Sequence, residues 1–449
     1  MPPKSPSQER PTGMVAFLTD TFGFSTALAS VVAALMAFVG LVVVVWVVRS
    51  APPRTLTLSG GRPGSSFQWF AESYKKALAL HGVELRIEPS GGSEENLRRL
   101  ESKESGVDIG FVQGGLAENE NVSQLVSLGS VAYEPLWIFY SGPAPMSRLS
   151  QLEGKRIALG IPGSGTHELA LKLLKANGIT GEPTKLINLD AEQSAKGLLD
   201  GSLDAVFLMG DSASIQTLRS LLVAPNVQLY SFSQADAYVR RFNFLNRMVL
   251  PEGSIDLGKD LPARDVALVG PTVELVARSD LNSALSDLVL EVAQQVHGRA
   301  GLLQKRGEFP APLEHEFRIS EDALRFYKSG KGYIYRAVGS FWLASLVNRL
   351  LVVLVPLLIL LIPAVRFFPN AYRWTIQIRF YQCYRRLLHV ERDITDKLTP
   401  EDQKALLTRI DEIELAVSRL KVPAYLADQF YGLKGHITFV RGRLRGAAA

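Results

Sequence analysis

The 449-residue chain has very few of the residues from which metal and disulfide sites are made. It contains a single cysteine, Cys383, which excludes an intrachain disulfide and a thiolate metal site. Its six histidines are scattered and form neither an HExxH motif nor a cluster. We therefore expect no metal and no cofactor.

The chain is also poor in charge, and its small positive excess is confined to one end. Charged residues make up 21% of the sequence and the net charge is +5. Residues 366–449 alone hold 15 Lys and Arg against 9 Asp and Glu. A nucleic-acid-binding protein would spread positive charge over a folded surface, so this distribution argues against nucleic acid as a partner.

Motifs for nucleotide binding and for catalysis are missing as well. No Lys follows the glycines as a P-loop requires, and Gly163-Ser164-Gly165 is followed by Glu168 where a dinucleotide-binding motif needs its third glycine. The G-x-S-x-G pattern of a serine hydrolase is absent, and His167 fits the first turn of a helix better than a catalytic base. We expect no enzymatic activity.

Two long hydrophobic runs are present. Residues 21–48 carry no charge, and residues 337–365 carry only Arg349. Each exceeds the roughly 20 apolar residues that cross a bilayer. The first is too long for a cleaved signal peptide and lacks its small-residue cleavage pattern, which favours a retained anchor. The basic tail favours cytoplasmic N- and C-termini, in a bacterial inner membrane, with the long middle segment in the periplasm.

The two ends of the chain differ from its middle. Residues 1–20 are expected to form a disordered tail. In the basic tail, apolar residues recur at alternating spacings of four and three in three successive sets. The pattern predicts three short helices that pack on each other, or a surface for self-association. A cytoplasmic partner could bind there.

The middle segment predicts an α/β fold of two lobes with parallel sheets, because short β-type runs alternate with helical stretches. A linker-type stretch, Ser141-Gly142-Pro143-Ala144-Pro145, marks the expected seam. The predicted organisation is a tail at 1–20, a span at 21–48, lobe 1 at 54–140, lobe 2 at 141–231, a return to lobe 1 at 232–335, a span at 337–365 and a helical tail at 366–449.

Four turns rich in Gly and Ser stand where a strand should end and a helix begin. They are residues 59–67, 90–97, 108–115 and 160–166. In open α/β sheets, ligands bind beyond the carboxyl ends of the strands. Helix N-termini there present free N–H groups and a positive dipole end, which suit an anion such as a carboxylate.

Taken in order, these turns resemble the TAXI family of solute-binding proteins from TRAP transporters. The resemblance lies in residues 59–67, 91–93, 96–97, 108–113, 154–160, 163–166 and 201–207. It covers about residues 55–331. It implies a type II periplasmic-binding-protein fold that closes over a small anionic solute, such as a dicarboxylate or an amino acid. The positions that match the family's ligand-binding turns are Gly60, Gly61, Ser65, Ser66, Phe67, Ser93, Asn96, Gln113, Ser164, Gly165, Thr166 and Gly210.

This chain departs from a secreted binding protein because it keeps an anchor, adds a second span and ends in a basic helical tail. The resemblance implies a membrane-anchored solute-binding component, with membrane lipid and TRAP permease subunits as partners. The alternative is a ligand-responsive sensor or adaptor that scaffolds a cytoplasmic partner through its tail.

Overall fold

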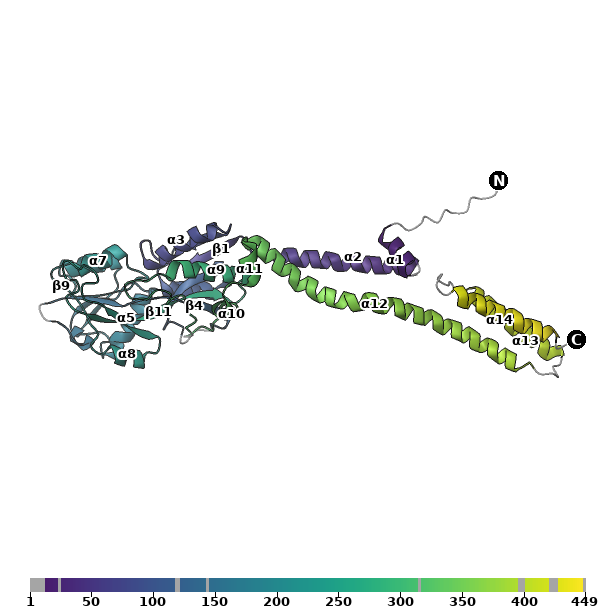
Figure 1. Ribbon diagram of the computed structural model, residues 1–449. Coiled ribbons are helices and arrows are strands. Elements are labelled where there is room, and N and C mark those ends of the chain that lie inside the picture. Colours follow the sequence, from purple (N-terminus) through teal and green to yellow (C-terminus); the bar gives the residue numbers. More distant parts are fainter. Residues whose placement is uncertain are drawn as a thin grey trace, which may run out of the picture. The chain divides into compact units, whose positions relative to one another are not determined.

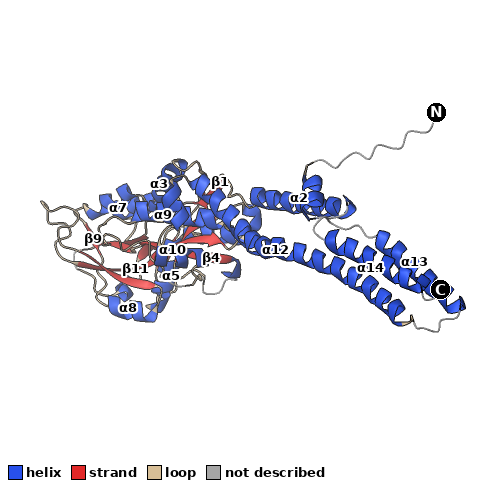
Figure 2. Ribbon diagram, turned by 45° about the vertical axis from the view of Figure 1, so that its right-hand side comes forward, coloured by secondary structure: helices blue, strands red, loops and turns tan. Residues whose placement is uncertain are grey.

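The computed structural model describes residues 13–22, 26–117, 122–142, 145–313, 316–394, 400–419 and 427–446. Most of the expected disordered tail, part of the expected linker at 141–145 and the segments between the last helices lie outside these ranges. The chain divides into two compact units: Ala51–Val347, and Met1–Ser50 with Asn348–Ala449. Among the described residues, all strands belong to the first unit (Figures 1 and 2).

The described part of the first unit contains eleven strands with helices between them. The strands and helices before the first crossing between the lobes are β1 (Thr55–Ser59), α3 (Ser66–Ala79), β2 (Glu84–Glu88), α4 (Ser93–Glu101), β3 (Ile109–Gln113) and β4 (Leu125–Tyr133). Next come β5 (Trp137–Ser141), β6 (Arg156–Ala158), α5 (Gly165–Ala176), β7 (Lys185–Ile187), α6 (Ala191–Leu199), β8 (Ala205–Leu208), α7 (Ile215–Leu222), β9 (Val227–Leu229), α8 (Ala235–Arg241) and β10 (Leu245–Leu250). The last are β11 (Val266–Arg278), α9 (Ser283–His297), α10 (Glu321–Ser329) and α11 (Tyr333–Val338), and short 3₁₀ turns lie at Lys103–Ser105, Val122–Gln124 and Leu149–Leu152.

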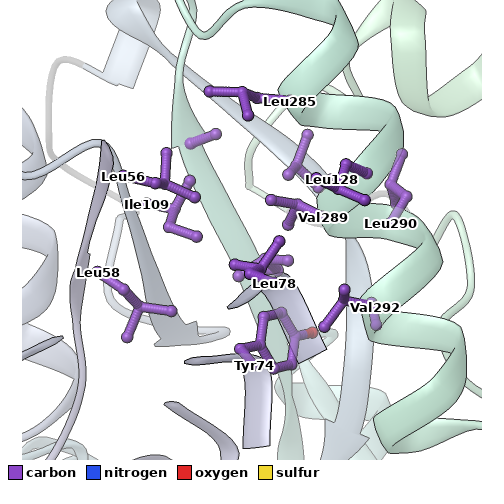
Figure 3. Packing of buried hydrophobic residues seen from close by; sticks show 14 of the residues in the cluster. Leu56, Leu58, Tyr74, Leu78, Ile109, Leu128, Leu285, Val289, Leu290 and Val292 are labelled. Atoms are coloured by element: carbon purple, nitrogen blue, oxygen red, sulfur yellow. The ribbon is translucent and has the colours of Figure 1, made fainter. Parts of the chain in front are cut away.

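The strands of lobe 1 are the second half of β11, then β3, β1 and β2, with β4 paired to β11; the sheet continues through the first half of β11 to β10, which pack with lobe 2. Alternate residues of β1 are buried and all five residues of β3 are, so β3 lies at the centre of the sheet. Figure 3 shows the core that results, in which Leu56 and Ile109 of the sheet pack near Leu285 and Val289 of α9. Burial of such apolar side chains is the main force that holds the lobe together.

Lobe 2 is built on the sheet β7-β6-β8-β5-β9, and helices cover it. Both sheets are mixed, which corrects the expectation of parallel sheets. β1 and β6 pair with their neighbours in parallel, whereas β5 and β11 run antiparallel to theirs. The antiparallel strands are those that follow or form a crossing between the lobes, where the chain reverses its direction.

The crossings lie elsewhere than the sequence suggested. The chain enters lobe 2 at Glu134–Leu136, because β5 pairs with β8 and β9 of that lobe. The expected seam at 141–145 follows β5 and is therefore wrong. The return occurs within β11, whose first half pairs with β10 and whose second half pairs with β3 and β4. Residues 232–270 accordingly stay with lobe 2, where Tyr238 and Leu268 join its core clusters.

The chain leaves lobe 1 through α11 and the first residues of α12 (Phe341–Arg392). Phe341 belongs to the lobe 1 core. The Trp342 indole N–H donates to the carbonyl of His81 at 3.0 Å, and the Arg54 guanidinium lies 5.4 Å from the centre of the Trp342 ring. The start of α12 is thus packed against lobe 1.

The second unit is helical. It comprises α1 (Met14–Phe22), α2 (Thr26–Arg49), the rest of α12, α13 (Pro400–Ser418) and α14 (Ala427–Gly446). Residues 14–20, expected to be disordered, form most of α1, because Met14, Val15, Phe17 and Leu18 give it an apolar side. The hydrophobic run at 337–365, which we predicted to be a span, lies mostly in α12. This helix begins at Phe341 and continues beyond residue 365 to Arg392, over 52 residues.

The C-terminal helices pack around one apolar core. Leu387 and Val390 of α12, Ile410 of α13, and Ile437 and Val440 of α14 are all buried in it. These residues belong to the three sets with alternating spacing, so packing of the three helices on each other is observed. The first of the three predicted helices is the continuation of α12 and not a separate helix.

Candidate functional site

The four Gly/Ser-rich turns meet where the two lobes face each other. Lobe 1 supplies the turns before α3 and α4 and the end of β3. Lobe 2 supplies the turn before α5 and the segment after β8. Hydrogen bonds cross between them: Ser66 N–H donates to the Gly210 carbonyl at 2.8 Å, and the Gln113 amide donates to the Gly165 carbonyl at 3.0 Å. We call this region the interlobe seam.

Asp211, which follows β8, lies at the centre of the seam and is completely buried. One of its carboxylate oxygens accepts the Gly165 N–H at 2.7 Å, and the other accepts the Thr166 hydroxyl at 2.9 Å. The Ser212 hydroxyl and the Ser93 N–H stabilise its charged form and so lower its pKa, and Gly92 of lobe 1 packs so closely that an added Cβ would lie 2.5 Å from a carboxylate oxygen. Gly165 and Ser93 begin α5 and α4, so one carboxylate meets helix N-termini from both lobes.

A second acidic side chain, Glu134, lies next to Asp211 at the first crossing between the lobes. It is 3% exposed, and its carboxyl group accepts the N–H group of Asp211 at 2.8 Å. No described Lys, Arg or His forms an ion pair with either acid. The contacts of the two carboxyl groups are therefore with backbone N–H groups and a hydroxyl.

Burial dominates the electrostatics of both acids. It raises the pKa of Glu134 well above its ordinary range, and the neighbouring Asp211 carboxylate raises it further. Burial also raises the pKa of Asp211, while the donors from Ser212, Thr166, Gly165 and Ser93 oppose the rise by stabilising the charged form.

Two glycines allow the lobes to approach this closely. A Cβ atom on Gly165 would lie 2.1 Å from the Gln113 amide oxygen, which belongs to the other lobe. A Cβ atom on Gly92 would lie 2.5 Å from an Asp211 carboxylate oxygen, and Gly92 has a φ of +135° that other residues rarely adopt. The backbone is thus fitted to direct contact between lobes.

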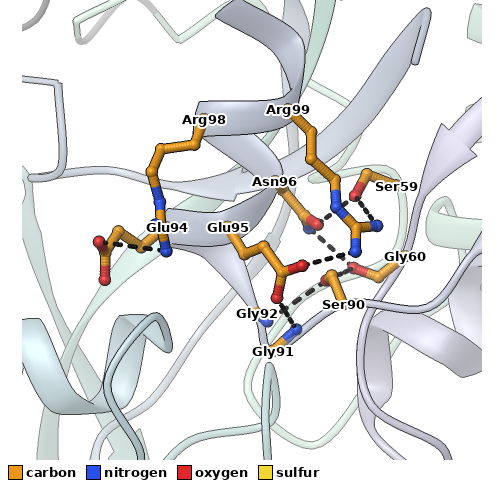
Figure 4. Close-up of polar contacts among 10 residues, drawn as sticks. All are labelled: Ser59, Gly60, Ser90, Gly91, Gly92, Glu94, Glu95, Asn96, Arg98 and Arg99. Carbon is orange, nitrogen blue, oxygen red and sulfur yellow. Dashed lines mark hydrogen bonds and ion pairs between the residues drawn. The ribbon is translucent and has the colours of Figure 1, made fainter. Parts of the chain in front are cut away.

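The turn before α4 is held in place by bonds within lobe 1 (Figure 4). The Glu95 carboxylate accepts the Gly91 N–H at 2.6 Å and pairs with Arg99. The Ser90 hydroxyl donates to the Gly60 carbonyl at 3.1 Å. These contacts fix the turn so that the Ser93 N–H points into the seam.

Of the predicted site residues, several do meet at the seam. They are Gly61, Ser66, Ser93, Gln113, Gly165, Thr166 and Gly210, each of which contacts the other lobe or Asp211 or lies within van der Waals reach of them. Several of their donors bind groups of the protein itself, whereas the Ser66 hydroxyl and the Gln113 amide oxygen are buried without a hydrogen-bond partner among the described residues.

The other predicted residues serve structural purposes. Phe67 is fully buried in the lobe 1 core. The Asn96 amide is used within lobe 1, where it donates to the carbonyls of Gly60 and Phe111 at 2.7 and 2.8 Å. Ser65 and Ser164 accept N–H groups as the N-caps of α3 and α5. Their side chains therefore are not available to a solute.

Sequence reasoning missed both acids. A signal for Asp211 existed: it stands two residues after Leu208-Met209, at the carboxyl end of a fully buried strand and directly after Gly210. The sequence signal for Glu134 was weaker: it is an acid directly before Pro135, in a segment without a helical or strand pattern.

Two mixed sheets joined by two crossings, with helix N-termini facing each other across the seam, define the two-lobed periplasmic-binding-protein-like fold. Residues 69–297 match the NMT1-like family, and this chain belongs to that family. The match spans both lobes and excludes both hydrophobic helices and the helical tail.

Solved structures similar to this chain are solute-binding proteins. An ancestral arginine-binding protein bound to arginine is 15% identical over 54% of this chain and 92% of its own, with a TM-score of 0.36. The aliphatic sulphonate binding protein SsuA from Escherichia coli is 14% identical over 66% and 84%, with a TM-score of 0.35. PhnD1 from Prochlorococcus marinus, in complex with methylphosphonate, is 12% identical over 62% and 99%, with a TM-score of 0.39.

Proposed function

We propose that this protein is a membrane-anchored, extracytoplasmic solute-binding protein of the TAXI type that captures a small carboxylate for a TRAP-type transport system. The observation that carries the proposal is the convergence of two helix N-termini, from opposite lobes, on a single carboxylate. Backbone N–H groups at such positions bind an anion without a metal ion or a basic side chain.

The class of ligand follows from these donors. The Gly165 N–H and the Thr166 hydroxyl now donate to the two oxygens of the Asp211 carboxylate, and the N-terminus of α4 packs against it through Gly92. A solute carboxylate has the same charge and geometry, so it can use the same donors. A dicarboxylate or an amino acid offers this group together with a second group that lobe 2 or the rim of the seam would recognise.

Membrane anchoring is supported by two helices that are long and apolar enough to cross a bilayer, Thr26–Arg49 and Phe341–Leu360. The 24 residues of α2 make it about 36 Å long, against a hydrocarbon core of about 30 Å. Only 6% and 11% of the residues in their most apolar segments are buried within the protein, whereas the core helix of a soluble protein is mostly buried. Two spans place both termini on one side of the membrane, and the basic tail favours the cytoplasm.

The second candidate function, a sensor or adaptor, is favoured by the continuity of α12. A single helix runs from Phe341, in the lobe 1 core, to Leu387 and Val390, in the core of the C-terminal helices. A partner that binds the tail would distinguish this function, and the test is capture of that partner by the full chain but not by a variant truncated after Arg392.

The test of the proposed function uses the full chain in lipid nanodiscs and a panel of dicarboxylates, amino acids, sulfonates, phosphonates and nucleotides. Binding is measured by calorimetry and by hydrogen exchange of the lobes. We expect a carboxylate to bind and, at 100 times its dissociation constant, to stabilise the lobes by about 2.7 kcal/mol. If no member of the panel binds, the proposed function is refuted.

A further inference from the structure

The anion position of the seam is already filled, and the group that fills it belongs to the chain. On the basis of the proposed function, we propose that Asp211 is an intramolecular ligand: its carboxylate takes the place of a solute carboxylate, holds the lobes closed without solute, and must leave before a solute can enter.

The groups packed around the Asp211 carboxylate come from both lobes, as they would for a bound solute. Gly165 and Thr166 belong to lobe 2, as Asp211 does, and donate to it at 2.7 and 2.9 Å. Gly92, the N-cap residue of α4, belongs to lobe 1 and packs so closely that an added Cβ would lie 2.5 Å from an Asp211 carboxylate oxygen. A ligand closes a two-lobed protein because it gains contacts that exist only in the closed state. For Asp211, the contact with the start of α4 is such a contact.

Asp211 does not have the local role that an acid after a strand often has. Capping the next helix, α7, falls to Ser214, whose hydroxyl oxygen accepts the Thr217 N–H at 3.0 Å. The Asp211 side chain turns away from α7 and toward α4 and α5. Glu134 fixes this orientation, because it accepts the Asp211 N–H and lies against Gly210, and so holds the turn that carries the carboxylate.

The seam leaves no room for a second carboxylate beside Asp211. A Cβ atom on Gly92 would already lie 2.5 Å from the Asp211 carboxylate oxygen. Further bonds close the lobes around it, including Ser66 N–H to Gly210 and Glu95 N–H to the Gly163 carbonyl at 3.3 Å. A solute therefore competes with a group that is tethered to the site and always present.

This competition sets the apparent affinity. A tethered group has an effective concentration of millimolar or more. A solute binds only the fraction of molecules in which Asp211 has left, so its apparent dissociation constant rises in inverse proportion to that fraction. Asp211 thus raises the solute concentration that is needed for binding, so only an abundant or tightly binding solute displaces it.

The test is chemical rescue of Asp211→Gly in the full chain in nanodiscs. Hydrogen exchange is measured for amides 92–97 and 163–169, at the starts of α4 and α5. In the wild type without solute we expect these amides to be protected. In Asp211→Gly we expect exchange at least about tenfold faster, because Gly165 and Thr166 lose their acceptor and the start of α4 loses the group that it packs against. Sodium acetate at about 0.1 M should restore protection, while sodium chloride of equal ionic strength should not.

A matched control is Asp190→Gly. Asp190 is also an aspartate of lobe 2 that accepts an N–H at a helix start, from Gln193 at 2.8 Å, but it caps α6 away from the seam. Its loss should leave the seam amides unchanged, with or without acetate. Asp211→Asn keeps the side-chain size, and we expect it to weaken protection without creating an acetate site.

Three results would overturn the inference: unprotected seam amides in the solute-free wild type, full protection in Asp211→Gly, or equal acetate protection of both proteins. The exchange measurement on the solute-free wild type needs no variant, so it can refute the inference even if Asp211→Gly does not fold. Failure of the proposed function gives a different set of results. Acetate rescue of Asp211→Gly without any solute binding to the wild type would support Asp211 as an internal ligand and refute solute capture. A solute that binds the wild type and Asp211→Gly with equal affinity would support solute capture and refute Asp211 as an internal ligand.

Discussion

The sharpest stability prediction concerns Glu274, in the half of β11 that belongs to lobe 1. Its side chain is completely buried. Burial, and to a lesser extent the nearby Glu316 carboxylate, raise the pKa of Glu274 from an ordinary value of 4.5 to about 8, while the Ser127 hydroxyl opposes the rise. The folded protein therefore keeps this carboxyl protonated at pH values where the unfolded chain has released the proton.

The sign and size of the effect follow from linkage. Because the folded pKa is raised, the stability contributed by Glu274 is fully present below pH 4.5 and is lost progressively up to about pH 8. Each pH unit in this window costs about 1.4 kcal/mol, so the total loss is on the order of 5 kcal/mol. Glu274→Gln keeps the shape of the protonated side chain and removes the proton equilibrium, so it should be the more stable protein at pH 8.

The assay is hydrogen exchange of the buried β3 amides in the full chain, between pH 5 and pH 8.5, corrected for the intrinsic rate. We expect the advantage of Glu274→Gln over the wild type to grow by about 1.4 kcal/mol per pH unit. Glu84→Gln is the control, because Glu84 is exposed in β2 and its 3.6 Å pair with Arg86 is open to solvent. A difference between Glu274→Gln and wild type that stays constant with pH would refute the argument.

Three further substitutions test other parts of the structure. Gly165→Ala places a Cβ 2.1 Å from the Gln113 amide oxygen and should cost more than about 2 kcal/mol, seen as faster exchange on both sides of the seam. Trp342→Phe removes the donor to the His81 carbonyl and should destabilise lobe 1 by about 1 kcal/mol in urea unfolding. Ile410→Ala empties a fully buried position among the C-terminal helices and should cost about 2–5 kcal/mol, seen as faster tryptic cleavage of the tail with the lobes unchanged.

Two of these substitutions have a matched control in the same unit. For Gly165→Ala it is Gly332→Ala, where the added Cβ meets nothing closer than 3.6 Å. For Ile410→Ala it is Leu415→Ala, on the same helix but 54% exposed. If either control has the effect of its partner, side-chain burial does not explain the result. Unchanged lobe 1 stability in Trp342→Phe would show that α12 is not anchored through this bond.

The regular parts of the fold could be predicted because their patterns are local. β1, β3 and the helices of both lobes follow from alternation or helical spacing over a few residues. β4 and β10 were not predicted, because Gly129 interrupts the first and Asn246 and Arg247 the second. The crossing at Glu134–Leu136 was misplaced for a different reason: whether β5 pairs with strands of lobe 1 or lobe 2 is a long-range choice that the composition of a linker does not encode.

The site was predicted only in part for a similar reason. Helix N-termini can be recognised from Ser93 or from Ser164 and the glycines around them, so the donors were found. Which acceptor they bind depends on tertiary packing, and Asp211 lies 45 or more residues from Thr166 and Gly165 in the sequence. A pattern that indicates an anion site does not indicate whether the anion is a solute or the protein's own side chain.

The way the chain enters and leaves the lobes bears on the choice between tethered binding and signalling. β1 begins at Thr55, shortly after α2 ends at Arg49, and Arg54 lies over the Trp342 ring at the start of α12. Both connections to the hydrophobic helices therefore leave from lobe 1, while lobe 2 is joined to lobe 1 by Glu134–Leu136 and β11. Release of Asp211 would move lobe 2 relative to lobe 1 without moving the two connections apart.

A sensor that signals by sliding one span against the other needs those connections to move, whereas a tethered binder needs one lobe held and the other free. The arrangement thus favours the tethered binder. It follows that a bis-maleimide cross-link between cysteines introduced at positions 54 and 342, in a Cys383→Ala background, should leave the rescue of Asp211→Gly by acetate unchanged. Loss of rescue in the cross-linked protein would mean that opening of the seam does displace the connections, and the sensor would then become the better account.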